Sequence, residues 1–170
     1  VDVNAIDWPE FEAGGSIATR KASHKAINAI AAAVPQLLGG SADLAGSNGS
    51  LLSGEGFISG DDFTPRNLTF GVREHAMASM CNGMVLHGGL VPYCATFLVF
   101  HDYMRPAVRL TSLMQQRVIY IYTHDSVFVG EDGPTHQPIE QLMAMRLIPG
   151  LVDIRPADAA ETVEAWKIAL

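Results

Sequence analysis

Glu74 is the residue whose type and position point most directly to acid–base chemistry. It lies in the run Gly-Val-Arg-Glu-His at positions 71–75, after a β-rich segment at 67–70. The glycine predicts a turn, and the residues that follow favour a helix with Glu74 in its first turn. An acid there is often explained by the helix dipole alone, which contributes about 0.3–1 kcal/mol. The run by itself therefore fits a structural acid or a proton-transferring one, with Arg73 as a candidate ion-pair partner.

Histidine and aspartate side chains gather in a second region of the sequence, at 124–136. His124, Asp125, Asp132 and His136 are all possible metal ligands. No pair among them has the HxxxH or CxxC spacing of a zinc site. We therefore expect no metal site in this chain.

Aromatic residues recur where a strand is expected to end and a helix to begin. Phe97, Phe100 and Tyr103 are spaced i, i+3, i+6, which on spacing alone is typical of core packing. Arg20 at a helix start has the pattern of a solvated residue, and Asp43 that of a turn acid. The glycine-rich stretches contain neither a GxGxxG motif nor a P-loop lysine motif, so the sequence does not favour nucleotide binding.

Strands and helices are expected to alternate along the chain. The patterns predict strands at 37–42, 67–70, 90–96, 117–123 and 151–155, and helices at 23–33, 73–87, 101–115, 138–147 and 157–170. Pro35 and Gly88-Gly89 end two helices, Pro106 is expected to interrupt the third, and Pro138 to lie in the first turn of the fourth. Residues 1–16 are interpreted as a linker or arm, and 44–66 as a long irregular loop. This order predicts a three-layer α/β/α fold with a mostly parallel sheet.

Ligands of such sheets bind at the carboxyl ends of the strands. The residues expected at or just beyond those ends are Asp43, Ser47, Glu74, Phe97, His124 and Asp132. Their placement predicts one site at this edge of the sheet.

Composition narrows the possible partners. The net charge of −7 over 170 residues argues against nucleic acid or an acidic membrane as a partner. Two cysteines, no signal peptide and no long apolar run favour a cytoplasmic protein.

The high apolar content leaves two explanations open: a face covered by another domain, or an Ala- and Gly-rich core. The chain starts without Met and stops within a helical pattern, so we expect a piece of a longer protein.

Four segments, in order and spacing, resemble the pyrimidine-binding domain of the transketolase family. They are the runs at 39–44, 71–77, 95–100 and 130–138, the last reading Gly-Glu-Asp-Gly-Pro-Thr-His-Gln-Pro. The resemblance covers residues 17–170 and implies a thiamin-diphosphate-binding fold. It also implies transfer of a two-carbon ketol unit between sugar phosphates. A related thiamin-diphosphate enzyme such as dihydroxyacetone synthase is the alternative within this class.

The resemblance assigns a role to each candidate residue. Glu74 matches the family's cofactor-activating glutamate, which exchanges a proton with the pyrimidine ring. The implied cofactor-binding residues are Asp43, Glu74, Phe97, Phe100 and Tyr103. The implied substrate-binding residues are Arg20 and Ser47 for the phosphate and His124, Asp132 and His136 for the sugar hydroxyls, with His136 also catalytic.

The resemblance further implies that the active site is composite. The diphosphate group and its Mg²⁺ or Ca²⁺ ion would be bound by a separate diphosphate-binding domain of the other subunit in a homodimer. The GDG…N motif of that domain is missing from this sequence. The chain alone is therefore expected to be inactive, and a non-enzymatic α/β partner subunit is the alternative from another class.

Overall fold

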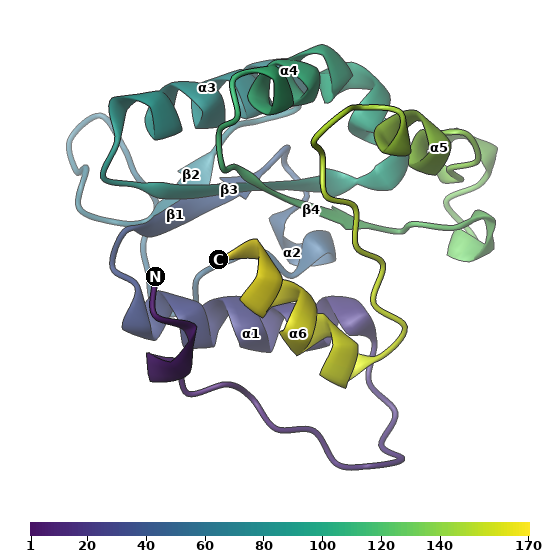
Figure 1. The fold of residues 1–170 in the computed structure, drawn as a ribbon, viewed down its shortest axis with the longest axis horizontal. Helices are drawn as coiled ribbons and strands as arrows, with labels where there is room; N and C mark the ends of the chain where they lie inside the picture. The colour runs from purple at the N-terminus through teal and green to yellow at the C-terminus, as the bar shows by residue number, and fades with distance from the viewer.

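The computed structural model describes all of residues 1–170 and has a parallel sheet at its centre (Figure 1). The four strands lie in the order β2-β1-β3-β4. They are β1 (Leu37–Ser41), β2 (Asn67–Thr69), β3 (Val91–Phe97) and β4 (Ile119–Thr123). All three neighbouring pairs are parallel, so the carboxyl ends of the strands meet at one edge.

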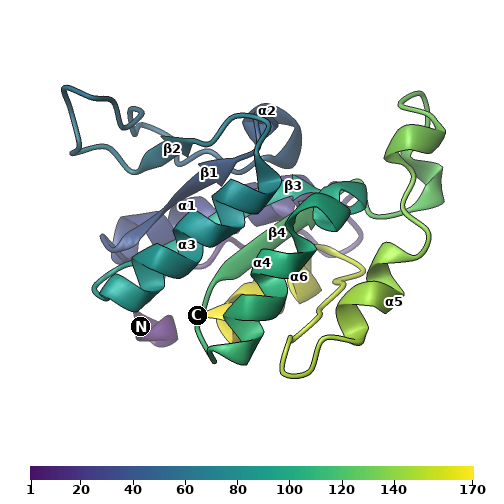
Figure 2. The same ribbon diagram turned by 90° about the horizontal axis from the view of Figure 1, so that it is seen from above.

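Helices cover both faces of the sheet and make three layers, which confirms the predicted fold class. α1 (Thr19–Ala33) and α6 (Ala159–Ala169) lie together on one face, and α3 (Glu74–His87) and α4 (His101–Leu113) on the other (Figures 1 and 2). Ile27 and Trp166 lie in the core cluster of the first face, and Met77 and Met104 in that of the second. None of the helices combines the length and hydrophobicity that a membrane crossing requires.

Short elements connect these layers. They are the helices α2 (Ala45–Asn48) and α5 (Gln141–Arg146) and the 3-10 turns η1 (Val3–Ala5), η2 (Leu98–Phe100), η3 (Val127–Val129) and η4 (Pro134–His136). In the N-terminal residues, Ile6 is buried in the α1–α6 core, and the indole of Trp8 donates to the Val3 carbonyl at 2.9 Å.

Glycines let the neighbours of β1 approach it closely. A Cβ at Gly39 would collide with the carbonyl of Tyr93 in β3, and one at Gly40 with the carbonyl of Leu68 in β2. β1 is therefore fixed between its neighbours at positions that no larger residue can occupy.

Four segments differ from the sequence prediction by more than a shift of one or two residues at an end. α1 begins at Thr19 instead of residue 23, because Ala22 already packs in the core. α4 runs through Pro106 without interruption, although a proline there removes one helical hydrogen bond; the buried residues on either side of it, Met104 and Ala107, pack in the core and hold the helix in place. The expected loop at 44–66 contains α2, and the expected helix at 138–147 is reduced to α5, leaving Pro138 before the helix.

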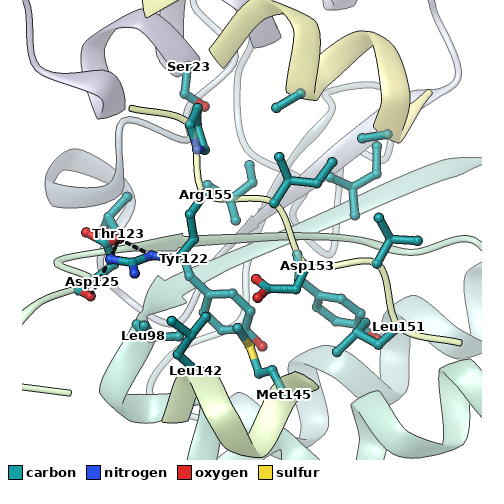
Figure 3. Close-up of a pocket in the computed structure, with 18 of the residues that line it drawn as sticks. Ser23, Leu98, Tyr122, Thr123, Asp125, Leu142, Met145, Leu151, Asp153 and Arg155 are labelled. Carbon is teal, nitrogen blue, oxygen red and sulfur yellow. Dashed lines mark hydrogen bonds and ion pairs between the residues drawn. The ribbon is translucent and has the colours of Figure 1, made fainter. Parts of the chain in front are cut away.

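The predicted strand at 151–155 is wrong. The segment pairs with no strand, and β4 is the last strand of the sheet. A cavity of about 1240 Å³ is lined by both β4 and this segment, with Tyr122 and Asp153 among its lining residues (Figure 3). Arg155 anchors the end of the segment through an ion pair of 2.8 Å with Asp125. The cavity separates side chains of the segment from those of β4, and the segment forms no backbone ladder with it.

Candidate active site

Two aromatic and two histidine rings pack together beyond the carboxyl ends of β3 and β4. Phe97 is the last residue of β3, and His124 follows β4 directly. Their rings stack with centroids 3.7 Å apart. His136, which ends η4, meets Phe100 edge-on at 5.3 Å and Phe97 at 6.0 Å. The structure thus brings together residues from three segments that the sequence places up to 39 positions apart.

The aromatic rings continue outward as a row. Phe97 and Phe100 are stacked at 5.9 Å, and Phe100 and Tyr103 are tilted at 6.1 Å. Tyr103 is 65% exposed. The i, i+3, i+6 spacing therefore gives a ring surface that passes from the core to solvent, because η2 and the first turn of α4 turn the three side chains the same way.

Arg20 reaches the same cluster from α1. Its Nη1 lies 3.3 Å from His124 Nε2 and 3.5 Å from the Ser47 carbonyl oxygen in α2. The two predicted phosphate-contacting residues and one predicted hydroxyl-contacting residue are therefore neighbours.

The surroundings of His124 favour its uncharged ring. Burial is the largest cause that lowers its pKa, and the Arg20 guanidinium and His136 act in the same direction. Asp132 and Asp125 oppose the shift. His124 therefore faces ligands as a neutral imidazole near pH 7.

Glu74 lies at the same edge of the sheet, as the first residue of α3. Gly71 precedes it with a φ of 68°, which is the turn that the sequence predicts. Glu74 is only 8% exposed. Its carboxylate has no hydrogen bond or ion pair to any other residue of the chain. Arg73 is not its ion-pair partner, because the guanidinium instead donates to the Phe70 carbonyl at 3.2 Å. Neither Glu74 nor Asp43 is hydrogen-bonded to the ring cluster.

Two of the predicted residues have a left-handed backbone. Asp43 has a φ of 63° and His124 a φ of 54°. Such a conformation in a residue other than glycine costs of order 1 kcal/mol and is typical of functional sites. Each of the two residues stands just beyond the end of a strand.

Three polar side chains behind His124 were not singled out by the sequence. Ser41, Asn48 and Thr123 are buried and form hydrogen bonds with one another. The sequence carried only a weak signal for these three residues. Ser41 and Thr123 are polar residues at the ends of β1 and β4, and Asn48 lies in a loop rich in polar residues. No group of three or more His, Cys, Asp or Glu side chains in the chain is placed to hold a metal ion.

Comparison with known proteins places this arrangement in one family. A family model described as transketolase, pyrimidine binding domain, matches residues 15–170. The transketolase of Halalkalibacterium halodurans is 60% identical over 162 residues, which is 95% of this chain and 24% of that protein. A crystal structure of transketolase from Campylobacter jejuni superimposes with a TM-score of 0.93 at 45% identity, covering 99% of this chain and 26% of that one.

A more distant structure shares the fold over a larger part of its own length. It is described as a split-gene transketolase, an inactive β4 tetramer, and matches with a TM-score of 0.68 at 27% identity, over 91% of this chain and 48% of that one. This chain spans about a quarter of the length of the curated relatives it matches. On the family match and these similarities, the chain belongs to the transketolase family, as its pyrimidine-binding domain.

Proposed function

We propose that this chain, through residues 17–170, supplies the pyrimidine-binding half of a transketolase active site. The complete site transfers a two-carbon ketol unit between sugar phosphates with thiamin diphosphate. The proposal is carried by the cluster of Arg20, His124, Phe97 and His136 at the carboxyl edge of the sheet in a chain of this family.

The residues present fit the pyrimidine end of thiamin diphosphate. Phe97, Phe100 and Tyr103 offer a ring surface that reaches solvent, and offset stacking on such rings is worth about 0.5–1.5 kcal/mol per pair. Glu74 offers a carboxylate with no partner in the chain, on a residue that is itself only 8% exposed. Its oxygens are therefore available to accept or share a hydrogen bond with a ligand atom. Asp43 is assigned to the same pocket.

Glu74 acts by holding and returning a proton. When bound, thiamin diphosphate supplies the nucleophilic carbon that receives the two-carbon unit. The Glu74 carboxyl group would hold the pyrimidine ring by a hydrogen bond and would give up and take back a proton at its own oxygen. Glutamine cannot exchange that proton, and aspartate is shorter by one methylene, so the role is specific to glutamate.

The remaining residues bind the sugar phosphate. Arg20, beside the Ser47 carbonyl, offers a planar donor fork suited to phosphate. His124, Asp132 and His136 bind the sugar hydroxyls, and His136 also acts near the reacting carbonyl. Such contacts depend on the position of each hydroxyl, so they select the configuration of the sugar.

The other half of the site comes from a partner. We infer that a diphosphate-binding domain of the other subunit in a homodimer, with Mg²⁺ or Ca²⁺, holds the diphosphate. The inactive tetramer described for a split-gene transketolase supports the view that a chain with this domain needs its counterpart. We also propose that residues 1–16 are a connecting arm and that the protein works in the cytoplasm.

The proposal is tested in the full-length parent enzyme with xylulose 5-phosphate and ribose 5-phosphate. Glu74→Gln should lower kcat about 10²-fold or more at saturating thiamin diphosphate, the range expected for loss of general acid–base catalysis. Glu164→Gln is the matched control, because Glu164 is exposed on α6 and pairs only with Lys167. Near-normal turnover of Glu74→Gln would remove the catalytic assignment, and absence of ketol transfer in the wild type would remove the function.

A further inference from the structure

A series of hydrogen-bonded side chains leads from the carboxyl end of β1 to His124. Ser41 Oγ donates to Asn48 Oδ1 at 2.8 Å, and Asn48 Nδ2 donates to Thr123 Oγ1 at 2.7 Å. Thr123 Oγ1 lies 2.9 Å from His124 Nδ1, and His124 Nε2 lies 3.3 Å from Arg20 Nη1. The polar chain therefore connects β1, α2 and β4 to the guanidinium of α1.

Its inner members are deeply buried. Asn48 is 0% exposed, Ser41 3% and Thr123 8%. A buried polar group left without a partner costs about 1–3 kcal/mol, and here each of these side chains is paired with the next. These hydrogen bonds depend on one another, because the loss of any one side chain leaves another without a partner.

The positions of the hydrogen atoms follow from the donor at the outer end. Arginine can only donate, so His124 Nε2 must accept the hydrogen bond from Arg20. A neutral imidazole carries one ring proton, which must then be on Nδ1. Thr123 Oγ1 consequently accepts from His124 Nδ1 and from Asn48 Nδ2, which uses both of its acceptor positions.

We propose that Asn48 and Thr123 are positioning residues that hold His124 as the neutral Nδ1-protonated tautomer, with Nε2 as an acceptor. In this state the single lone pair of Nε2 accepts the hydrogen bond from Arg20. In the proposed function on which this step rests, the imidazole and the guanidinium are thereby presented to the sugar phosphate in one fixed arrangement.

The rest of the surroundings act in the same direction. Phe97 stacks on the imidazole at 3.7 Å and holds the plane of the ring. Arg20 and His136 disfavour a charged ring, while Asp132 and Asp125 favour it, and burial adds the largest contribution toward the lower pKa. A protonated His124 would be a donor at both nitrogens and would lose Arg20.

Nitrogen NMR of the His124 ring in this chain tests the tautomer directly. The wild type and Thr123→Ser, which keeps the hydroxyl, should show the Nδ1-protonated form at pH 7.5. Thr123→Val keeps the shape but removes the acceptor, so the ratio of the two tautomers should change by about tenfold or more, as expected for loss of a buried hydrogen bond. Thr135→Val is the matched control, because Thr135 has the same contact, at 2.8 Å, with the next histidine in sequence, His136.

Each result decides the proposal. An Nε2-protonated ring in the wild type would overturn it, as would an unchanged tautomer in Thr123→Val. If Thr123→Val does not fold, Arg20→Ala replaces it, since removing the donor should release His124 Nε2 and allow both tautomers.

Kinetics of the parent enzyme separate this inference from the proposed function. Thr123→Val should raise KM for sugar phosphates several-fold more than it lowers kcat, with recovery in Thr123→Ser. A positive NMR result in a parent without ketol transfer would contradict the function and leave the tautomer assignment intact.

Discussion

Arg20 lies between two acceptors, the Ser47 carbonyl and His124 Nε2, and this placement leaves most of its donors free for a ligand. In the parent enzyme, Arg20→Ala should raise KM for phosphorylated sugars about tenfold or more, because a charge-assisted contact is worth about 1.5–3 kcal/mol. Steady-state kinetics with phosphorylated and unphosphorylated acceptors measure the effect, with Lys21→Ala, an exposed neighbour on α1, as the control. Equal losses for both acceptor classes would contradict a phosphate role.

His101 makes the stability of the domain depend on pH. The residue is fully buried, its Nδ1 lies 2.7 Å from the Tyr122 hydroxyl, and its Nε2 has no partner. Burial lowers the pKa of His101 from 6.5 to about 4. The unfolded chain therefore binds more protons between these values, so the stabilising effect is complete above pH 6.5 and is lost as pH falls toward 4.

Urea unfolding at pH 7 and pH 4.5 measures this dependence. His101 should account for about 2–3 kcal/mol of the stability lost between the two values. His101→Gln keeps hydrogen-bonding capacity but cannot be protonated in this range, and it should show a shallower loss. The same pH dependence in both proteins would mean that His101 does not contribute.

The sequence points to candidate site residues that lie in recognisable local runs and does not single out those without one. Glu74, Phe97 and His136 stand in runs that resemble a known family, and this resemblance made them candidates. Asn48 and Thr123 are ordinary polar residues until the fold brings them together across 75 positions. Which polar residues become buried partners depends on tertiary packing, which no local pattern contains.

At the scale of the elements, β1 depends on its two glycines. Gly39→Ala should lower the free energy of unfolding by about 1–3 kcal/mol or prevent folding, because the new methyl group overlaps the Tyr93 carbonyl and the backbones must separate. Gly83→Ala is the control. It adds the same methyl group to α3 where nothing lies within 4 Å, and should stabilise by about 0.5–1 kcal/mol through helix propensity. Equilibrium denaturation compares the two, and equal effects would contradict the steric argument.

The sequence predicted most strands and helices, and it failed where an element depends on its neighbours or lacks a marked end. β1, β3 and β4 were found because short apolar runs lie between turn residues. Residues 151–155 have the same composition, but a strand exists only where a neighbour supplies its hydrogen bonds. Helix α1 was predicted four residues short, because its N-cap is Ala18, which supplies no side-chain cap to mark the start.

For the whole molecule, the incomplete site sets an upper limit on what the chain does alone. The ring surface and Glu74 contribute roughly 1–3 kcal/mol through stacking and one or two hydrogen bonds. Immobilising a ligand costs several kcal/mol, and in the proposed function a separate domain binds the diphosphate. We therefore expect the isolated chain to bind thiamin diphosphate only weakly and to show no ketol transfer.

Isothermal titration of the chain with thiamin diphosphate and Mg²⁺ measures this binding. Adding the separate diphosphate-binding domain of the parent should restore affinity. Micromolar binding by the chain alone would contradict the expectation. Analytical ultracentrifugation adds a second readout, because Met80, Leu86, Tyr103, Leu110 and Leu113 on α3 and α4 are exposed and exposed apolar surface favours self-association.

At the two left-handed residues just beyond β1 and β4, the stability of the domain and its proposed function favour different amino acids. Glycine at position 43 or 124 would relieve the backbone strain at once. Selection of a variant library for heat resistance alone would therefore enrich substitutions that remove side chains of the proposed site. Engineering of this domain for heat resistance should therefore keep both positions unchanged, and accept at these two points a lower stability than the fold permits.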